Sequence, residues 1–356
     1  MLHGTDTDIR TAIQNATAEG RHLLRISGDY TISETILLPS GFTLILEDCA
    51  LTMADGVMTQ MFRNERCPQD GVLPAGGVRT LSDCDSDIHL LGVGRAILDG
   101  GVYNGLSERN SLKNGNPHIS RNNLLLFCNV DGFSVENITV RNQRWWALNF
   151  LFCRRGVLRN IDFCADDTRI DENGNRVHGL LQSSYESVCV KNADGIDLRA
   201  GCHDFLIENI TGFCEDDIVA LTDLPGKLEE MFGVRDAPRD IYNVVIRNVR
   251  GCSYCSMIRL LNQSGAKMHN ILIDGVFDAS KDSLHMDRGI FGVRVGDTHL
   301  YGPEQPKDEN MDSVAVRNVY VRTRCAIQLA GGMTNVTTEN INGFDGCSRL
   351  VQDDRT

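Results

Sequence analysis

The sequence has no apolar run of the roughly 18 to 20 residues that a membrane-spanning helix needs. Its start, MLHGTDTDIR, lacks the basic region followed by an apolar core that marks a signal peptide. Positive charge is in deficit too, with a formal net charge of −13 at pH 7. These absences predict a cytoplasmic protein, or a secreted one if a leader has been trimmed, that binds neither membranes nor nucleic acid.

Helical periodicity is also scarce. Residues 1–20 can form a short helix with Ile9, Ile13 and Ala16 on its apolar face, capped by Asp6 or Thr7. After it no long 3.6-residue periodicity appears, and short β-rich segments are separated by Gly, Pro and Asp. One such segment, 88–101, is expected to form two short strands with tight glycine turns. Thirteen cysteines in a long chain without an export signal are not expected to form disulfides.

What the chain does contain is a repeat. The phrase apolar-x-Asn-Ile/Val recurs at 135–138, 158–161, 207–210, 246–249 and 316–319, with weaker copies at 273–276 and 338–341. The closest copies are 22 and 23 residues apart. A repeat of this length, built from strands without helices between them, predicts an all-β fold: a single-stranded right-handed parallel β-helix spanning 1–356 as one domain, with the N-terminal helix as a cap.

Two further expectations follow from the repeat. The asparagines should stack as a ladder and hydrogen-bond to turn backbone in their own and the next rung. The longer polar segments between repeats should wall a cleft; these are residues 64–77, 101–122, 165–188, 223–240 and 298–312.

The stretch from Cys189 to Leu224 holds two copies of a carboxylate-rich turn that runs into a short apolar strand. Asp194 lies in the first copy, and Asp216 and Asp217 lie in the second, 22 and 23 residues later. One winding of that length brings these carboxylates one layer apart, about 4.8 Å. Carboxylates that close cannot all ionise freely, and separating their pKa values is one way to make an acid and a base. We therefore expect all three to be catalytic.

A column of polar residues should lie beside these acids. Several strands share the form apolar-polar-apolar, with the middle residue facing outward. Stacked rungs would then build an exposed column of Asp197, Arg259, Arg294 and Gln328. Trp145 and Trp146 lie one rung earlier and could form an aromatic platform for a sugar ring. Arginine forks suit a carboxylate on a substrate.

These motifs resemble the polygalacturonase family, the family 28 glycoside hydrolases, which belong to the pectin lyase-like β-helices. Asn192-Ala193-Asp194 is similar to the family's Asn-Thr-Asp motif, and Asp216-Asp217 to its Asp-Asp motif about one rung later. The resemblance implies that Asp216 is the general acid, and that Asp194 and Asp217 hold and activate the attacking water, with inversion at the sugar carbon. Chemistry agrees, because an inverting hydrolase needs one protonated and one ionised carboxyl group. Arg294 would bind a uronate carboxylate.

The chain departs from the family at two motifs. Cys255-Ser256-Met257 stands where Gly-His-Gly is expected, and Gly296 stands where the lysine of Arg-Ile-Lys is expected. Both changes alter the substrate subsite, so the substrate could be a sugar other than plain polygalacturonate. Arg259 could replace part of the missing charge.

The main expectation is thus a glycoside hydrolase that cleaves acidic, pectin-like oligosaccharides without a cofactor or metal. Two alternatives remain open. One is a β-helix lyase or intramolecular transglycosylase, in which Arg259 or Arg294 would be the base, often with calcium. The other is a carbohydrate-binding β-helix that has lost its catalytic apparatus. Fold alone does not choose among them. The sequence carries no interface signature, so the oligomeric state stays open.

Overall fold

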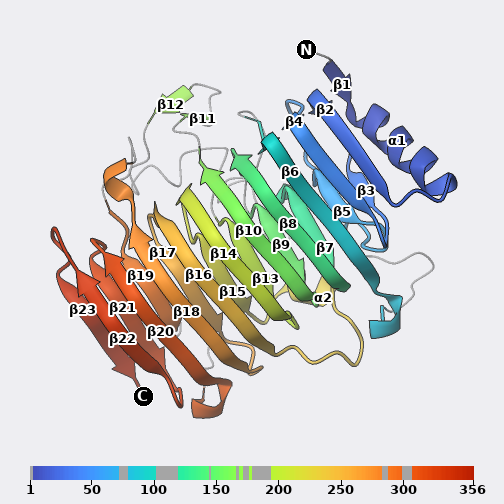
Figure 1. Cartoon of the computed structure of the whole chain (residues 1–356). Coiled ribbons are helices and arrows are strands. Elements are labelled where there is room, and N and C mark those ends of the chain that lie inside the picture. The colour runs from blue at the N-terminus through green and yellow to red at the C-terminus, as the bar shows by residue number, and fades with distance from the viewer. Residues whose placement is uncertain are drawn as a thin grey trace.

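The computed structural model describes residues 3–71, 79–101, 119–143, 146–165, 168–170, 176–178, 194–282, 288–298 and 307–356. All described strands but two belong to two sheets of parallel strands that run side by side along the molecule (Figure 1). The N-terminal helix lies at one end of the stack and the C-terminus at the other. The predicted fold, a right-handed parallel β-helix, is confirmed.

The long-strand sheet is formed by strands of up to 15 residues that pair in sequence order. Its members are β1 (His3–Thr5), β2 (Leu23–Ile32), β4 (Thr43–Met53), β6 (Asp85–Asp99), β8 (Val130–Arg141), β10 (Arg154–Cys164), β14 (His203–Cys214), β16 (Ile241–Ser253), β18 (Met268–Asp278), β20 (Met311–Val321) and β22 (Thr337–Gly343).

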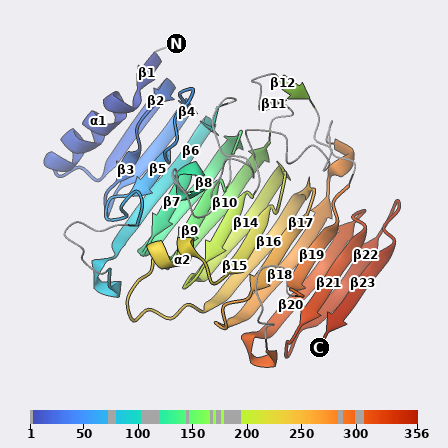
Figure 2. The same cartoon turned by 180° about the vertical axis from the view of Figure 1, so that it is seen from behind.

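The short-strand sheet lies behind it, as the reverse view shows (Figure 2). Its members are β3 (Ile36–Leu38), β5 (Phe62–Asn64), β7 (Leu125–Cys128), β9 (Leu148–Leu151), β13 (Ile196–Arg199), β15 (Val219–Asp223), β17 (Ser256–Asn262), β19 (Phe291–Gly296), β21 (Cys325–Gly331) and β23 (Arg349–Arg355).

Few elements stand outside these sheets. Strands β11 (Thr168–Ile170) and β12 (Arg176–His178) form an antiparallel pair, and helix α2 (Lys227–Met231) lies on the outer side of the short-strand sheet. Short 3-10 helices occur at Leu81–Asp83, Ile119–Asn122, Ser280–Asp282 and Asp308–Asn310. No helix in the described part of the chain is long and apolar enough to cross a membrane.

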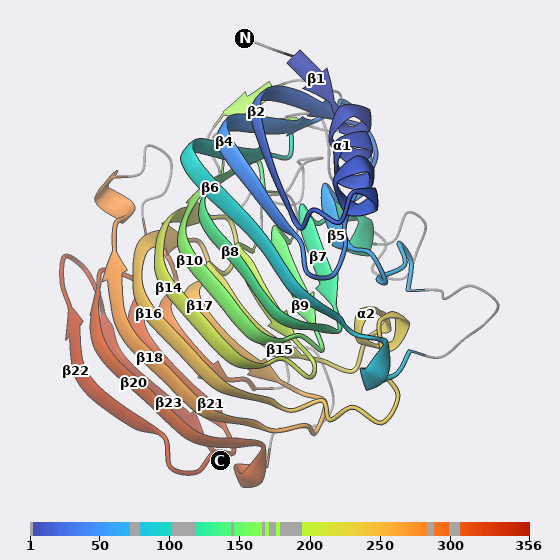
Figure 3. The same cartoon turned by 45° about the vertical axis from the view of Figure 1, so that its right-hand side comes forward.

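The repeated asparagine bends each long strand. Asn137, Asn160, Asn209 and Asn248 have φ between 53° and 60°, in the left-handed region that asparagine tolerates better than most residues. At this point the strand changes direction, and Figure 3 shows the long strands sweeping around the molecule. The ladder predicted from the repeat is therefore present. Its asparagines form the corner of β8, β10, β14, β16, β20 and β22, and Gly275 takes the equivalent place in β18.

The ladder's hydrogen bonds differ in detail from the expectation. Each Nδ2 donates to the Oδ1 of the asparagine one rung back, at 2.7 Å for Asn160 to Asn137, 3.0 Å for Asn209 to Asn160 and 2.8 Å for Asn248 to Asn209. The partner is a neighbouring side chain and not turn backbone. An amide can do this because it carries a donor and an acceptor, so identical residues form a continuous chain.

The core fills the space between the two sheets. Inward-facing Leu, Ile, Val and Phe side chains form one cluster along the whole stack. At its centre the rings of Phe133 and Phe150 stack 5.0 Å apart, and Phe127 and Phe205 contact them edge to face. Such ring pairs add to the free energy gained by burying apolar area.

Helix α1 (Asp6–Ala18) covers the N-terminal end of this core with Ile9, Ile13 and Ala16, as predicted. Its cap differs from the prediction. The N-cap residue is Thr5, whose backbone N–H donates to Asp8 Oδ2 at 2.8 Å, and Asp6 already lies in the helix. Gly20 follows the helix with a φ of 70°.

Segment 88–101 was predicted wrongly as two strands. It belongs to the single strand β6, whose register to β8 shifts between Leu91 and Ile97. Gly94, with a φ of 64°, gives a bulge within the strand where a turn was expected. None of the cysteines in the described ranges takes part in a disulfide.

Candidate active site

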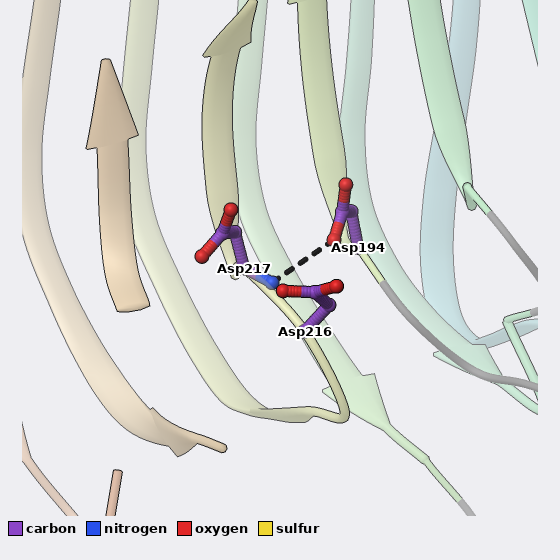
Figure 4. Close-up of side chains that lie close together, drawn as sticks. All are labelled: Asp194, Asp216 and Asp217. Carbon is purple, nitrogen blue, oxygen red and sulfur yellow. Dashed lines mark hydrogen bonds between the residues drawn. The ribbon is translucent and has the colours of Figure 1, made fainter. Parts of the chain in front are cut away.

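The three candidate acids lie where two consecutive strands of the short-strand sheet begin. Asp194 precedes β13, and Asp216 and Asp217 precede β15, one rung further along (Figure 4). Each offers a carboxylate oxygen, and these oxygens all lie within 4.8 Å of one another. The structure thus brings together the three residues that the 22- to 23-residue spacing selected.

Local backbone geometry fixes the cluster. Strands β13 and β15 pair with Ile196 opposite Val219, which places Asp194 opposite Asp217. The Asp217 N–H donates to Asp194 Oδ1 at 3.0 Å, and the Gly195 N–H donates to the Asp217 carbonyl oxygen at the same distance. A Cβ on Gly195 would lie 2.7 Å from the Ile218 carbonyl oxygen, so the residue after Asp194 must be glycine for the rungs to approach this closely.

Burial and mutual repulsion change how these groups ionise. Burial, followed by the charges of Asp197, Asp216 and Asp217, raises the pKa of Asp194 well above its ordinary value. Burial and the charge of Asp216 also raise the pKa of Asp217 to about 7, although nearby Arg259 opposes this. Asp216 is the most exposed of the three. The cluster therefore retains a proton near neutral pH, which an acid–base mechanism requires.

Segment 253–257, which includes the position where a Gly-His-Gly motif was expected, supports the cluster with backbone N–H groups and the Ser253 hydroxyl. The Ser256 N–H donates to Asp217 Oδ1 at 3.0 Å. Ser253 Oγ donates to the Asp216 carbonyl oxygen and accepts from the Cys255 N–H at 3.0 Å. Burial and the charges of Asp216 and Asp217 raise the pKa of the Cys255 thiol, which keeps it neutral.

The polar column has the predicted register. Asp197 pairs with Ala220, Ala220 with Arg259, Arg259 with Arg294, and Arg294 with Gln328. Its environment differs from the prediction, because Asp197, Arg259 and Gln328 are buried where an exposed column was expected. Outward-facing residues of this sheet are covered by protein where helix α2 and side chains such as Asp297 and Asp354 lie over them.

Both arginines of the column already have a carboxylate partner. Asp297, which is fully buried, contacts Arg259 at 2.6 Å and Arg294 at 3.3 Å. Arg259 and Arg294 are 7% and 14% exposed at their side chains. The two guanidinium groups share this carboxylate, and the charge of Arg259 also acts on Asp217. Gln328 donates to Asp354 Oδ2 at 2.8 Å.

Trp146 is half-buried against the small apolar cluster that helix α2 forms with the outer face of the short-strand sheet. The Arg199 guanidinium lies over its ring, 3.8 Å from the centroid, so this face of the ring is covered by protein. Trp145 and Asn192, the remaining predicted residues, lie outside the described residues.

Three charged residues that the sequence analysis missed complete the site: Arg199, Glu229 and Asp297. Arg199 contacts Asp197 at 3.2 Å and Glu229 at 3.0 Å. The two-residue spacing from Asp197 could have identified Arg199, because residues i and i+2 of a strand share a face. Glu229 lies on helix α2, inside a loop without periodicity, so no pattern pointed to it.

The same three acids could also hold a metal. Their carboxylate oxygens lie within 4.8 Å of one another, so one divalent cation could bind to all three. Hard cations prefer oxygen ligands. The described ranges offer no other group of this kind.

The sequence matches no protein-family model, and no curated protein matches it either. Solved structures do resemble it. A 1,3-α-1,4-β-D-galactose-4-sulfate-3,6-anhydro-D-galactose-2-sulfate 4 galactohydrolase is 13% identical, covers 99% of this chain and 90% of its own, and has a TM-score of 0.55. A polygalacturonase from Erwinia carotovora is 12% identical (96% and 95% covered, TM-score 0.51). The A-module of a mannuronan C-5 epimerase from Azotobacter vinelandii is also 12% identical (99% and 95% covered, TM-score 0.51). At such low identity the likeness shows the shared fold alone.

Proposed function

We propose that the protein is a glycoside hydrolase that cleaves acidic, uronate-containing oligosaccharides with an aspartate-based, inverting mechanism. One observation carries the proposal: three carboxylates from consecutive rungs lie within 4.8 Å, two of them buried with raised pKa values. A surface that only binds sugar has no use for such a cluster, because crowding like charges costs folding free energy. Such a cluster suits hydrolysis of a glycosidic bond, because that reaction needs a proton donor and a base close together.

In this proposal Asp216 protonates the glycosidic oxygen, because it is the most exposed of the three acids. Asp194 and Asp217 hold a water molecule, and the ionised member of the pair accepts the water proton as oxygen attacks the anomeric carbon. The carbon–oxygen bond to the leaving sugar breaks, and that sugar departs with the proton from Asp216.

The acidic character of the substrate is proposed from the two arginines. Arg294 is the more exposed of the pair, and its contact with Asp297, at 3.3 Å, is longer than that of Arg259. A substrate carboxylate would bind Arg294, while Asp297 keeps Arg259 in place. Polygalacturonase and galactohydrolase structures share this fold, which agrees with a carbohydrate substrate.

The test is a reducing-end assay on a panel of oligogalacturonides and other plant-wall oligosaccharides. Wild type should release reducing ends, and Asp216→Asn should lose at least about 10³-fold in kcat on natural substrates. Aryl glycosides with an acidic phenol leaving group need little protonation, so Asp216→Asn should keep much of its rate on them. Asp217→Asn should be slow on both. NMR of the first product should show the inverted anomer.

Equal loss by Asp216→Asn on both substrate types would contradict its role as the acid. Retention of anomeric configuration would contradict inversion. Binding without cleavage across the panel would instead favour a carbohydrate-binding protein.

A second candidate, a cation-dependent lyase, is favoured by the metal-compatible spacing of the same acids and by Arg259 near Asp217. A lyase leaves an unsaturated sugar that absorbs in the near ultraviolet and would be inactivated by a chelator. Activity that survives chelation and leaves no absorbing product would exclude this candidate.

A further inference from the structure

A chain of buried charges runs from the acid cluster to helix α2. Asp197 faces the same side of β13 as Arg199, which it contacts at 3.2 Å. Arg199 Nη1 donates in turn to Glu229 Oε1 at 3.0 Å. All three side chains are at least 95% buried. Ion pairs this deeply buried gain little net stability over apolar residues, so their presence points to a role other than stability.

At its other end the chain reaches the catalytic carboxylates. The Asp197 and Asp194 side chains interact at the start of β13, and the charge of Asp197 affects Asp194 more than any other neighbouring charge does. Asp194 Oδ1 accepts the Asp217 N–H at 3.0 Å. A displacement of Asp197 would therefore move the oxygen that, in the proposed mechanism, positions the attacking water.

Three groups hold the Arg199 guanidinium. Its fork spans two carboxylates, one from strand β13 and one from helix α2, and its plane lies 3.8 Å from the centre of the Trp146 ring. The fork and the stacking plane are both properties of arginine and not of lysine. Helix α2 is fixed in turn by Leu228 and Phe232, which pack against Leu126, Cys128 and Leu151 of the short-strand sheet.

We infer that Arg199, clamped between Glu229 and Trp146, is a positioning residue that holds Asp197 and through it the Asp194 carboxylate in the reactive arrangement. This inference rests on the proposed function of Asp194. Arg199 touches no reacting atom; it transmits the position of helix α2 to the acid cluster. A misplacement of about 1 Å at a reacting group can cost about 10²-fold in rate.

Two readouts test it. The first is kinetics on the substrate found in the reducing-end assay. The second is the amide resonance of Asp217 in a transverse-relaxation-optimised NMR spectrum, which reports the Asp194 oxygen that accepts its proton and needs no substrate. Arg239 provides a matched control, since it pairs with the buried Asp223 at the outer edge of the next strand.

Arg199→Met is expected to lower kcat about 10²-fold with KM unchanged, because only the reacting geometry is lost. It should also displace the Asp217 amide resonance. Arg199→Lys should recover part of kcat, because it keeps the charge without the fork. Arg239→Met should match wild type in both readouts. If Arg199→Met does not fold, Glu229→Gln replaces it and should show the same changes at smaller size.

A folded Arg199→Met protein with wild-type kcat and an unmoved Asp217 amide would overturn the inference. An equal loss in Arg239→Met would also overturn it, because the effect would then belong to the loop as a whole. If wild type hydrolyses nothing on the panel, the proposed function fails, and the amide resonance alone decides whether Arg199 positions the cluster.

Discussion

Two faces of this β-helix carry charged residues in opposite arrangements. On the outer side of the long-strand sheet one row of side chains alternates in sign from rung to rung: Glu136, Arg159, Glu208, Arg247, Asp274, Arg317 and Glu339. Arg159 lies 3.7 Å from Glu136 and 3.2 Å from Glu208, and Arg317 lies 2.9 Å from Asp274. Each charge thus has opposite charges as neighbours.

At the start of β13 and β15 the same rung spacing gathers charges of one sign. Asp194, Asp216 and Asp217 come from two rungs, and two of them are buried. Parallel in-register stacking repeats a position every 4.8 Å or so, and like charges at that distance repel more strongly when water is excluded.

The exposed row of alternating charges stabilises the fold, whereas the buried group of like charges destabilises it. In the exposed row no like charges are direct neighbours, and each opposite-charge pair adds a little to the free energy of unfolding. A buried group of acids must retain protons or lose free energy of folding. The following changes test this contrast, from the largest expected effect to the smallest.

The largest loss of stability is expected when a buried arginine beside the site is replaced. Asp297 is fully buried, and Arg259→Met removes its 2.6 Å ion pair and leaves it the weaker contact to Arg294 and the Thr298 N–H. Breaking a buried pair in this way costs about 3 to 5 kcal/mol. Urea unfolding measures the loss. The double variant Arg259→Met with Asp297→Asn should recover much of it, and failure to recover would show that packing of the Arg259 stem matters more than its charge.

Removing one acid should stabilise the protein, and only at high pH. The folded-state pKa of Asp217 is about 7, above its ordinary value of 3.8. Below the lower value the group is protonated in both states. Between the two values the unfolded state releases the proton that the folded state keeps, so the stability of the folded state falls as pH rises and the loss is complete above 7. Asp217→Asn should therefore match wild type near pH 4 and exceed it near pH 8 by on the order of 3 kcal/mol.

Urea unfolding at the two pH values checks this prediction. Arg317→Gln in the exposed row serves as the control and should show no comparable gain at either pH. A uniform gain for Asp217→Asn at both pH values would mean that packing and not ionisation causes it.

The fold and the acid cluster were accessible to prediction because both follow from repetition. The Asn-Ile/Val phrase marks a corner with positive φ in each rung that carries it, and Asp194 and Asp217 recur one winding apart. The burial of the column was not predictable in this way. It depends on Asp297 and on helix α2, which lie outside the repeat, so a period of 22 residues carries no information about them.

The asparagine ladder should show an intermediate effect. Asn209→Ala removes the hydrogen bonds to Asn160 and from Asn248 and places alanine at a φ of 57°. We expect a loss of about 2 kcal/mol, of which about 1 is the cost of positive φ. Asn209→Gly should lose only the free energy that comes from the hydrogen bonds, because glycine adopts this φ without strain. Equal losses in the two variants, measured by urea unfolding, would contradict a backbone contribution.

The smallest effect is expected in the exposed row, where solvent screens each charge. Arg247→Glu places a third acid between Glu208 and Asp274, which turns three alternating positions into a run of three like charges. The loss should be about 0.5 to 1 kcal/mol at low salt and should shrink at 1 M salt, where the Debye length is about 3 Å. Arg247→Gln, which removes attraction without adding repulsion, should lose about half as much. A loss that salt leaves unchanged would mean that the row stabilises the sheet through packing of the arginine stems and not through alternation of charge.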